Sequence, residues 1–92
     1  MAKLGGKTAI ITGGGSGLGE ASCELLAAEG ASVVVSDVNA EAADYTADTI
    51  NQMGGSAISL AHDVTNQDEW PQVVQTAVKE FGSLDILVNN AG

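Results

Sequence analysis

The chain has 92 residues, which bounds it to a single domain that buries roughly 60–65% of its unfolded surface. Apolar residues make up 45% of the sequence, which excludes a disordered protein, and the scarcity of aromatic residues predicts a core of Val, Ile, Leu and Ala. Twelve acidic and three basic side chains give a net charge of −9. We therefore expect neither nucleic acid nor a membrane as a partner, because almost nothing in the sequence neutralises phosphates.

Short β-branched runs alternate with longer segments that have helical periodicity. The predicted strands are residues 7–12, 32–37, 57–61 and 84–88, and the predicted helices are residues 18–29, 40–53 and 66–81. In the first helix, the apolar side chains that lie along one face are Leu18, Ala21, Leu25 and Ala28. The order β-α-β-α-β-α-β implies right-handed crossovers and therefore an α/β fold, a parallel sheet with flanking helices.

Residue types that favour helix ends mark the boundaries of these segments. Gly30 follows the first predicted helix, Asn39 is the expected N-cap of the second, and Thr65 or Asn66 opens the third. The sequence ends directly after the fourth predicted strand, which leaves one sheet edge and part of one face bare. We therefore expect residues 1–92 to be a half-domain of a longer single-domain protein.

A glycine-rich loop, residues 12–19 (TGGGSGLG), joins the first strand to the first helix. Glycines allow the backbone to turn tightly and to approach a ligand, and a helix N-terminus offers free N–H groups that suit a pyrophosphate. The loop has no basic side chain, so backbone N–H groups and the hydroxyls of Thr12 and Ser16 would have to hold the anion.

Other nucleotide-binding patterns fit this loop less well. A Walker A loop ends in Gly-Lys-Ser/Thr, whereas Glu20 follows Gly19 here. The G-x-G-x-x-G spacing is absent, and the acid that a methyltransferase usually places before its glycines is replaced by Ile11 and Thr12. The spacing present is T-G-x-x-x-G-x-G; taken alone, it is also compatible with a turn that binds no ligand.

Asp37 closes the second predicted strand, twenty residues after Gly17. A carboxylate at this place can accept hydrogen bonds from both hydroxyls of an adenosine ribose and would repel a 2′-phosphate. The neighbouring positions hold Ser16, Val38 and Asn39, none of them basic, which favours NAD over NADP. The alternative is a strand-end acid that caps the next helix.

Two further polar segments follow the third and fourth predicted strands. In a parallel sheet, ligands bind beyond the carboxyl ends of the strands, which would place Asp63 and Val64 beside an adenine. Asp63 could instead be an N-cap or turn acid, and we expect His62 to be structural or exposed to solvent rather than catalytic. The fourth strand ends in Asn-Asn-Ala-Gly, residues 89–92.

These elements, in this order, resemble the short-chain dehydrogenase/reductase family along the whole chain. The resemblance implies a Rossmann-type sheet that binds NAD. It also implies a line of cofactor-binding residues: Gly13, Ser16, Gly17, Leu18 and Gly19 at the pyrophosphate and nicotinamide side, Asp37 at the adenosine ribose, Asp63 and Val64 at the adenine, and Asn90, Ala91 and Gly92 at the cofactor ribose region. The stretch Asp63-Val64-Thr65, with Trp70 close behind, is similar to the hydroxysteroid and secondary-alcohol branch.

The resemblance further implies hydride transfer between nicotinamide and a small alcohol or carbonyl compound, by a full-length enzyme that is a dimer or tetramer. The family's catalytic Ser, Tyr-x-x-x-Lys pair and Asn all follow the Asn-Asn-Ala-Gly segment. The single tyrosine here, Tyr45, is followed four residues later by Thr49 instead of lysine. We therefore assign no catalytic residue and expect the 92-residue chain alone to be inactive. A stand-alone nucleotide-binding or regulatory module is the alternative function.

The remaining expectations concern redox state, metals and location. The single cysteine, Cys23, cannot form an internal disulfide and is expected to pack as a small side chain in a helix. We assign no metal ligands. No apolar run approaches the roughly 20 residues of a membrane span, and residues 1–6 are too short and polar for a signal peptide, so we expect a cytoplasmic protein.

Overall fold

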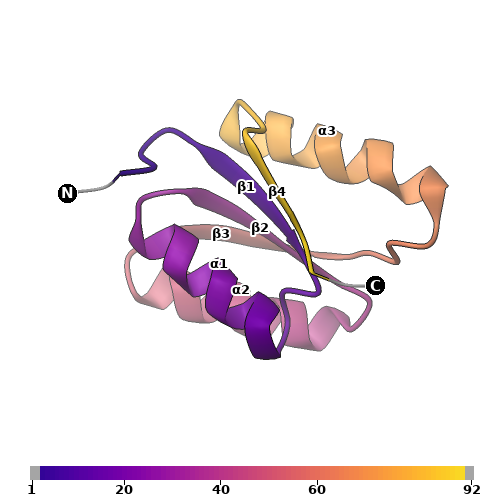
Figure 1. Cartoon of the computed structure of the whole chain (residues 1–92), viewed down its shortest axis with the longest axis horizontal. Helices are drawn as coiled ribbons and strands as arrows, with labels where there is room; N and C mark the ends of the chain where they lie inside the picture. The colour runs from indigo at the N-terminus through magenta and orange to yellow at the C-terminus, as the bar shows by residue number, and fades with distance from the viewer. Residues whose placement is uncertain (1–2, 91–92) are drawn as a thin grey trace.

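A computed structural model describes residues 3–90 of the chain as a four-stranded sheet between two layers of helices (Figure 1). The elements in chain order are β1 (Thr8–Thr12), α1 (Gly17–Ala28), β2 (Ser32–Asp37), α2 (Ala40–Gln52), β3 (Ser56–Ala61), the 3₁₀ helix η1 (Gln67–Glu69), α3 (Trp70–Phe81) and β4 (Ile86–Asn89). The predicted alternation of strands and helices is confirmed.

The four strands are parallel and lie in the order β3-β2-β1-β4. Ile11 of β1 lies opposite Val35 of β2 and Val88 of β4, so the carboxyl ends of the strands reach the same edge of the sheet. Helices α1 and α2 cover one face and α3 covers the other (Figure 1). The predicted parallel α/β fold is therefore confirmed.

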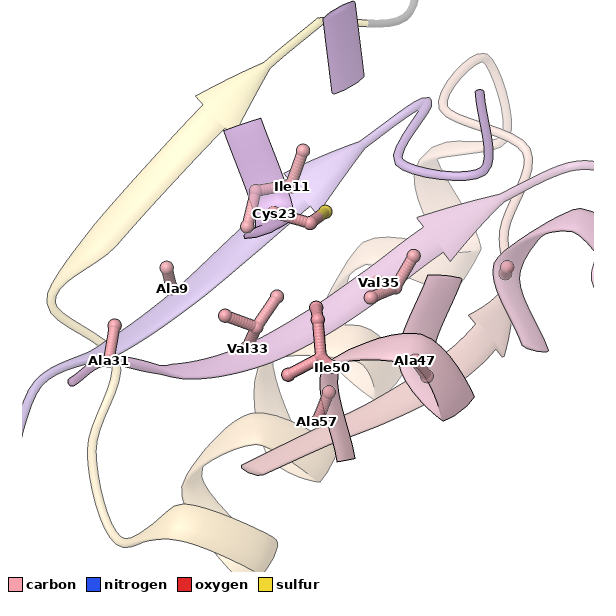
Figure 2. Packing of buried hydrophobic residues seen from close by; sticks show 10 residues of the cluster. Ala9, Ile11, Cys23, Ala31, Val33, Val35, Ala47, Ile50 and Ala57 are labelled. Atoms are coloured by element: carbon pink, nitrogen blue, oxygen red, sulfur yellow. The ribbon is translucent and has the colours of Figure 1, made fainter. Parts of the chain in front are cut away.

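Both faces of the sheet are packed, because alternate residues of a strand point to opposite sides. On the side of α1 and α2, the buried cluster is made of small and β-branched residues: Ala9, Ile11, Cys23, Ala31, Val33, Val35, Ala43, Ala47, Ile50 and Ala57 (Figure 2). On the side of α3, Val73 and Ala77 pack against Ile10 and Val34. The predicted aliphatic core is confirmed, although no leucine within residues 3–90 is fully buried.

Several ends of elements differ from the predicted bounds by one to four residues. The third predicted helix is split into η1, which Asn66 caps, and α3, which begins at Trp70. Strand β4 begins later than expected, at Ile86, because the carboxylate of Asp85 accepts a 2.9 Å bond from the N–H of Thr8. The side chain of Asp85, rather than a backbone carbonyl of β4, thus accepts the N–H of Thr8 where β1 and β4 begin to pair.

The predicted packing face of α1 is wrong. Leu18 and Leu25 are 79% and 64% exposed, and the residues that α1 buries are Gly19 and Cys23. A Cβ atom at Gly19 would lie 1.9 Å from the carbonyl oxygen of Gly13, so α1 approaches the loop too closely for any side chain. The face that α1 packs on the sheet is therefore the one that carries Gly19, Cys23, Leu26 and Ala27, and the close backbone contact at Gly19 fits only this orientation. Cys23 is fully buried, as predicted.

Candidate nucleotide-binding site

The predicted site residues that the structure describes lie at or after the carboxyl ends of the strands. At β1 the sheet order reverses, because β2 lies on one side of β1 and β4 on the other. The connections after β1 and β2 place their helices on one face, whereas the connection after β3 places α3 on the opposite face (Figure 1). In open α/β sheets, such a switch point leaves a crevice in which ligands bind.

Different structural constraints favour glycine at different positions of the loop. Gly13 and Gly17 have φ angles of 65° and 59°, in the left-handed region that favours glycine. The N–H of Gly14 donates to the carbonyl of Ser36 at 2.9 Å, which ties the loop to the end of β2. A Cβ atom at Gly17 would meet no atom within 4 Å, so this part of the loop faces open space. The loop thus has a packed side and a side that a ligand can approach.

The N-terminus of α1 receives no cap from a side chain. Its N-cap residue, Ser16, makes no capping hydrogen bond, whereas Asn39 accepts from the N–H of Ala42 at 3.1 Å at the start of α2. The first amides of a helix have no acceptor within the helix, and the helix dipole makes this end partly positive. The start of α1 is therefore suited to bind an anion.

The hydroxyl of Thr12 has a different role from the one expected. Thr12 is fully buried, and its Oγ1 atom lies 3.1 Å from the Oδ1 atom of Asn89, to which it can donate. The same oxygen accepts a 2.9 Å bond from the N–H of Asn90. Thr12 therefore fastens the end of β1 to the end of β4, and of the two hydroxyls considered for anion binding only that of Ser16 is exposed.

The carboxylate of Asp37 is tied to two backbone amides. Its Oδ2 atom accepts from the N–H of Gly15 at 3.0 Å, and its Oδ1 atom accepts from the N–H of Asn39 at 3.0 Å. The N-cap of α2 is Asn39, so capping does not explain Asp37. These bonds aim a half-buried carboxylate between the glycine loop and the exposed start of α2.

The segment after β3 is an exposed turn built around Asp63. The Oδ1 atom of Asp63 accepts from the hydroxyl and the N–H of Thr65, at 2.6 Å and 2.9 Å. The hydroxyl bond first, and the amide bond second, lower the pKa of the Asp63 carboxyl below its usual value. These contacts are those of a turn acid, the alternative considered from sequence. A contact of Asp63 or the half-buried Val64 with adenine stays a prediction.

Several predicted site residues meet in the structure, and others do not. Asn90 reaches the start of α1, because its Nδ2 atom lies 2.8 Å from the Cβ position at Gly19. Leu18 is exposed beside the loop. The predicted residues Ala91 and Gly92 lie outside the described residues. Tyr45 is exposed on α2, and its carbonyl accepts from the hydroxyl of Thr49.

One group of residues was missed from sequence: Ser36, His62 and Trp70 come together beneath the segment after β3. His62 is buried, which agrees with the structural role expected for it. The contacts join residues 26 and 8 positions apart, and no periodic pattern in the sequence indicates them.

Within residues 3–90, no three His, Cys, Asp or Glu side chains gather in a way that could hold a metal ion. Over the same residues, every helix is too short or too polar to cross a membrane. The cytoplasmic location stays a prediction.

A parallel sheet with a glycine loop at its switch point and a carboxylate at the end of β2 defines a Rossmann-type domain. Residues 7–92 match the short chain dehydrogenase family. The chain therefore belongs to the short-chain dehydrogenase/reductase family, as the motifs predicted.

Relatives with a named activity are similar to this chain along almost its whole length. The 7α-hydroxysteroid dehydrogenase of Escherichia coli K12 is 48% identical over 90 residues, which cover 98% of this chain and 35% of that protein. The cyclopentanol dehydrogenase of Comamonas testosteroni is 44% identical over 92 residues, covering 100% and 37%. A solved 7α-hydroxysteroid dehydrogenase, complexed with NADH and 7-oxo glycochenodeoxycholic acid, superposes with a TM-score of 0.95 at 47% identity, covering 99% and 36%. The chain thus spans little more than a third of these relatives, which include the predicted hydroxysteroid branch.

Proposed function

We propose that the chain is the cofactor-binding portion of an NAD-dependent oxidoreductase that transfers a hydride between nicotinamide and a small alcohol or carbonyl compound. The observation that carries this proposal is the uncapped N-terminus of α1, which begins at Gly17, where the backbone faces open space, and lies at the switch point of the sheet. A pyrophosphate there would meet unpaired amides and the positive end of a helix dipole. Similarity to a hydroxysteroid dehydrogenase complexed with NADH supports the same cofactor.

The proposed contacts follow the arrangement of the strand ends. The loop from Gly13 to Gly19 holds the pyrophosphate, and the side chains of Ser16 and Leu18 in this loop are exposed. Asp37 accepts from the hydroxyls of the adenosine ribose, since each of its oxygens has a second lone pair beyond the bonds described above. Asp63 and Val64 bind the adenine, and Asn90 lies near the second ribose.

A preference for NAD over NADP follows from charge. A 2′-phosphate would lie against the carboxylate of Asp37 without a basic side chain to offset the repulsion. The flanking residues Ser16, Val38 and Asn39 are exposed and uncharged, and the lysines are Lys3, Lys7 and Lys79. Lys7 directly precedes β1, so it lies at the sheet edge opposite the site.

Oxidation of an alcohol also needs a group that accepts the hydroxyl proton. The family's Ser, Tyr-x-x-x-Lys pair and Asn follow the Asn-Asn-Ala-Gly segment, so they would come from sequence beyond Gly92. Tyr45 does not replace them, because it lies on α2 and is followed at the required spacing by Thr49. We propose that residues 1–92 bind NAD without turning it over, and that the complete enzyme is a dimer or tetramer.

The alternative function is a nucleotide-binding or regulatory module without catalysis, which the same site geometry would serve. The coding sequence directly after Gly92 discriminates between the two. A Tyr-x-x-x-Lys motif there supports the oxidoreductase, and a reading frame without one supports the module.

The experiment that tests the proposed function measures calorimetric binding of NAD to the protein, together with NADH formation from a panel of secondary alcohols. We expect residues 1–92 to bind NAD and to form no NADH, and the protein extended through Tyr-x-x-x-Lys to do both. Failure of both forms to bind NAD would overturn the proposal. Turnover by residues 1–92 alone would show that a catalytic group lies within them.

A further inference from the structure

The imidazole of His62 is enclosed at the end of β3. The side chain is 2% exposed, and its Nδ1 atom lies 3.3 Å from the hydroxyl oxygen of Ser36. The backbone N–H of His62 donates to the carbonyl of Asp37 at 2.9 Å. This residue therefore connects the end of β2, which carries the proposed ribose-binding acid, to the start of the segment 63–66.

The hydroxyl of Ser36 connects the imidazole of His62 to the sheet. Its oxygen lies 3.3 Å from the carbonyl oxygen of Ile11, to which it can donate, and 3.3 Å from the Nδ1 atom of His62. The Nε2 atom of His62 is buried and has no hydrogen-bond partner among residues 3–90. Among these residues the ring is therefore bonded to the sheet through Nδ1 alone.

Trp70, the first residue of α3, meets this ring edge to face. The ring centroids are 4.4 Å apart and the planes are inclined by 89°, a favourable arrangement for aromatic pairs. The indole N–H of Trp70 donates to the carbonyl of Val64 at 3.2 Å. One aromatic pair thus links the sheet, α3 and the backbone of the turn.

We propose that His62 and Trp70 are positioning residues that hold the segment 63–66 in the conformation that receives the adenine of the cofactor. This inference rests on the proposed function, because it assumes that Asp63 and Val64 border the adenine. A segment held before binding loses less conformational freedom when the ligand arrives, so its affinity is higher. The two side chains act through the turn rather than by touching the cofactor.

The test compares His62→Phe and Trp70→Phe, which keep an aromatic ring in each place but remove the bonds to Ser36 and Val64. AMP is the probe, because it carries the adenosine end of the cofactor alone. We expect each variant to bind AMP about three- to tenfold more weakly than the parent protein. Phe81→Leu is the matched control, since Phe81 packs on the same side of the sheet at the far end of α3. It should leave AMP affinity unchanged.

A second readout reports on the turn without any ligand. Because the bonds from Thr65 lower the pKa of Asp63, loosening the segment should return that pKa toward its ordinary value of 3.8 in Trp70→Phe, measured by NMR titration, but not in Phe81→Leu. His62→Phe is left out of this readout, because His62 itself also lowers the pKa of Asp63 through its charge. If the parent protein binds AMP, unchanged AMP affinity in the two variants, or an unchanged Asp63 pKa in Trp70→Phe, would overturn the positioning role. A parent protein that binds no AMP would instead contradict the proposed function.

Discussion

The Oδ2 atom of Asp37 accepts a 3.0 Å hydrogen bond from the backbone N–H of Gly15. A Cβ atom at Gly15 would lie 2.9 Å from the same oxygen and 2.6 Å from the Cβ atom of Ala42 on α2. The proposed phosphate loop, the proposed ribose acid and α2 therefore pack as one unit that leaves no room for a side chain at position 15. A basic residue, the usual device for accepting a 2′-phosphate, cannot be placed there without moving α2.

Replacing Asp37 with alanine should narrow the preference for NAD over NADP by about tenfold or more, roughly 1.4 kcal/mol. The substitution removes both the acceptor for the ribose hydroxyls and the repulsion of the 2′-phosphate, so NAD affinity should fall while NADP affinity falls less or rises. The measurement is the ratio of the two dissociation constants by calorimetry.

Asp48→Ala is the control for this change, because it removes the same charge from an exposed position within α2. It should leave the ratio unchanged. A parent protein that prefers NADP, or an equal effect of the two substitutions, would contradict the assignment of Asp37.

Gly17 and Gly54 form a matched pair for testing the loop. Both have a positive φ, 59° and 91°, and a Cβ atom at either would meet nothing within 4 Å. Alanine at either position should lower the free energy of unfolding by about 1–2 kcal/mol through backbone strain. Only Gly17→Ala should also weaken NAD binding, by tenfold or more, because its Cβ atom would occupy the space of the pyrophosphate.

Denaturant melts and calorimetric titrations of the two variants separate these effects. Equal NAD affinity in Gly17→Ala and Gly54→Ala, at similar stability, would show that the glycine loop is only a turn. Cys23→Ala should likewise leave NAD affinity unchanged, since its side chain is buried behind the loop, where its Sγ atom lies 3.9 Å from the carbonyl of Gly14.

Periodicity and helix ends are local properties of a sequence. We could therefore predict the order of the elements, the parallel sheet and the glycine loop between the first strand and the first helix. Asn39 caps α2, and α3 ends at Phe81, as the sequence predicts. The orientation of α1 could not be predicted, since it depends on the close contact between Gly13 and Gly19. The same holds for the partners of Thr12 and His62, which come from elements distant in the sequence.

Burial raises the pKa of the Cys23 thiol from 9.0 to about 12, with smaller contributions from Glu24 and Glu20. Because the folded-state pKa is above the unfolded value, the protonated thiol favours the folded state fully below pH 9, and this contribution is lost as the pH rises toward 12. The free energy of unfolding should therefore fall over this range. Cys23→Ala has no thiol to ionise, so its free energy of unfolding should fall less over the same pH range.

Urea melts of both proteins at several alkaline pH values measure this difference, and the comparison cancels every contribution that the two proteins share. A thiol reagent gives an independent check, because native Cys23 should react far more slowly than the denatured chain. If the free energy of unfolding depends on pH identically in the two proteins, folding does not raise the pKa of the Cys23 thiol.

The last prediction concerns the edge of the sheet. Within residues 3–90, β4 pairs with β1 and with no second strand, and Leu87 projects 55% exposed on the side of α3. An open strand edge with an apolar side chain invites pairing with another chain, although a net charge of −9 opposes close approach. Residues 1–92 alone should therefore self-associate with rising concentration, and more strongly at high salt, which screens the charge.

Light scattering over a range of protein and salt concentrations measures this association, and Leu87→Lys should reduce it because a buried ammonium is costly at a paired edge. Met53→Lys makes a similar change in size and charge at a position that is 68% exposed at the end of α2. If the two lysine variants associate equally, general charge repulsion rather than the β4 edge controls the process. A parent chain that stays monomeric at every concentration and salt would mean that the edge of β4 is protected without a further strand.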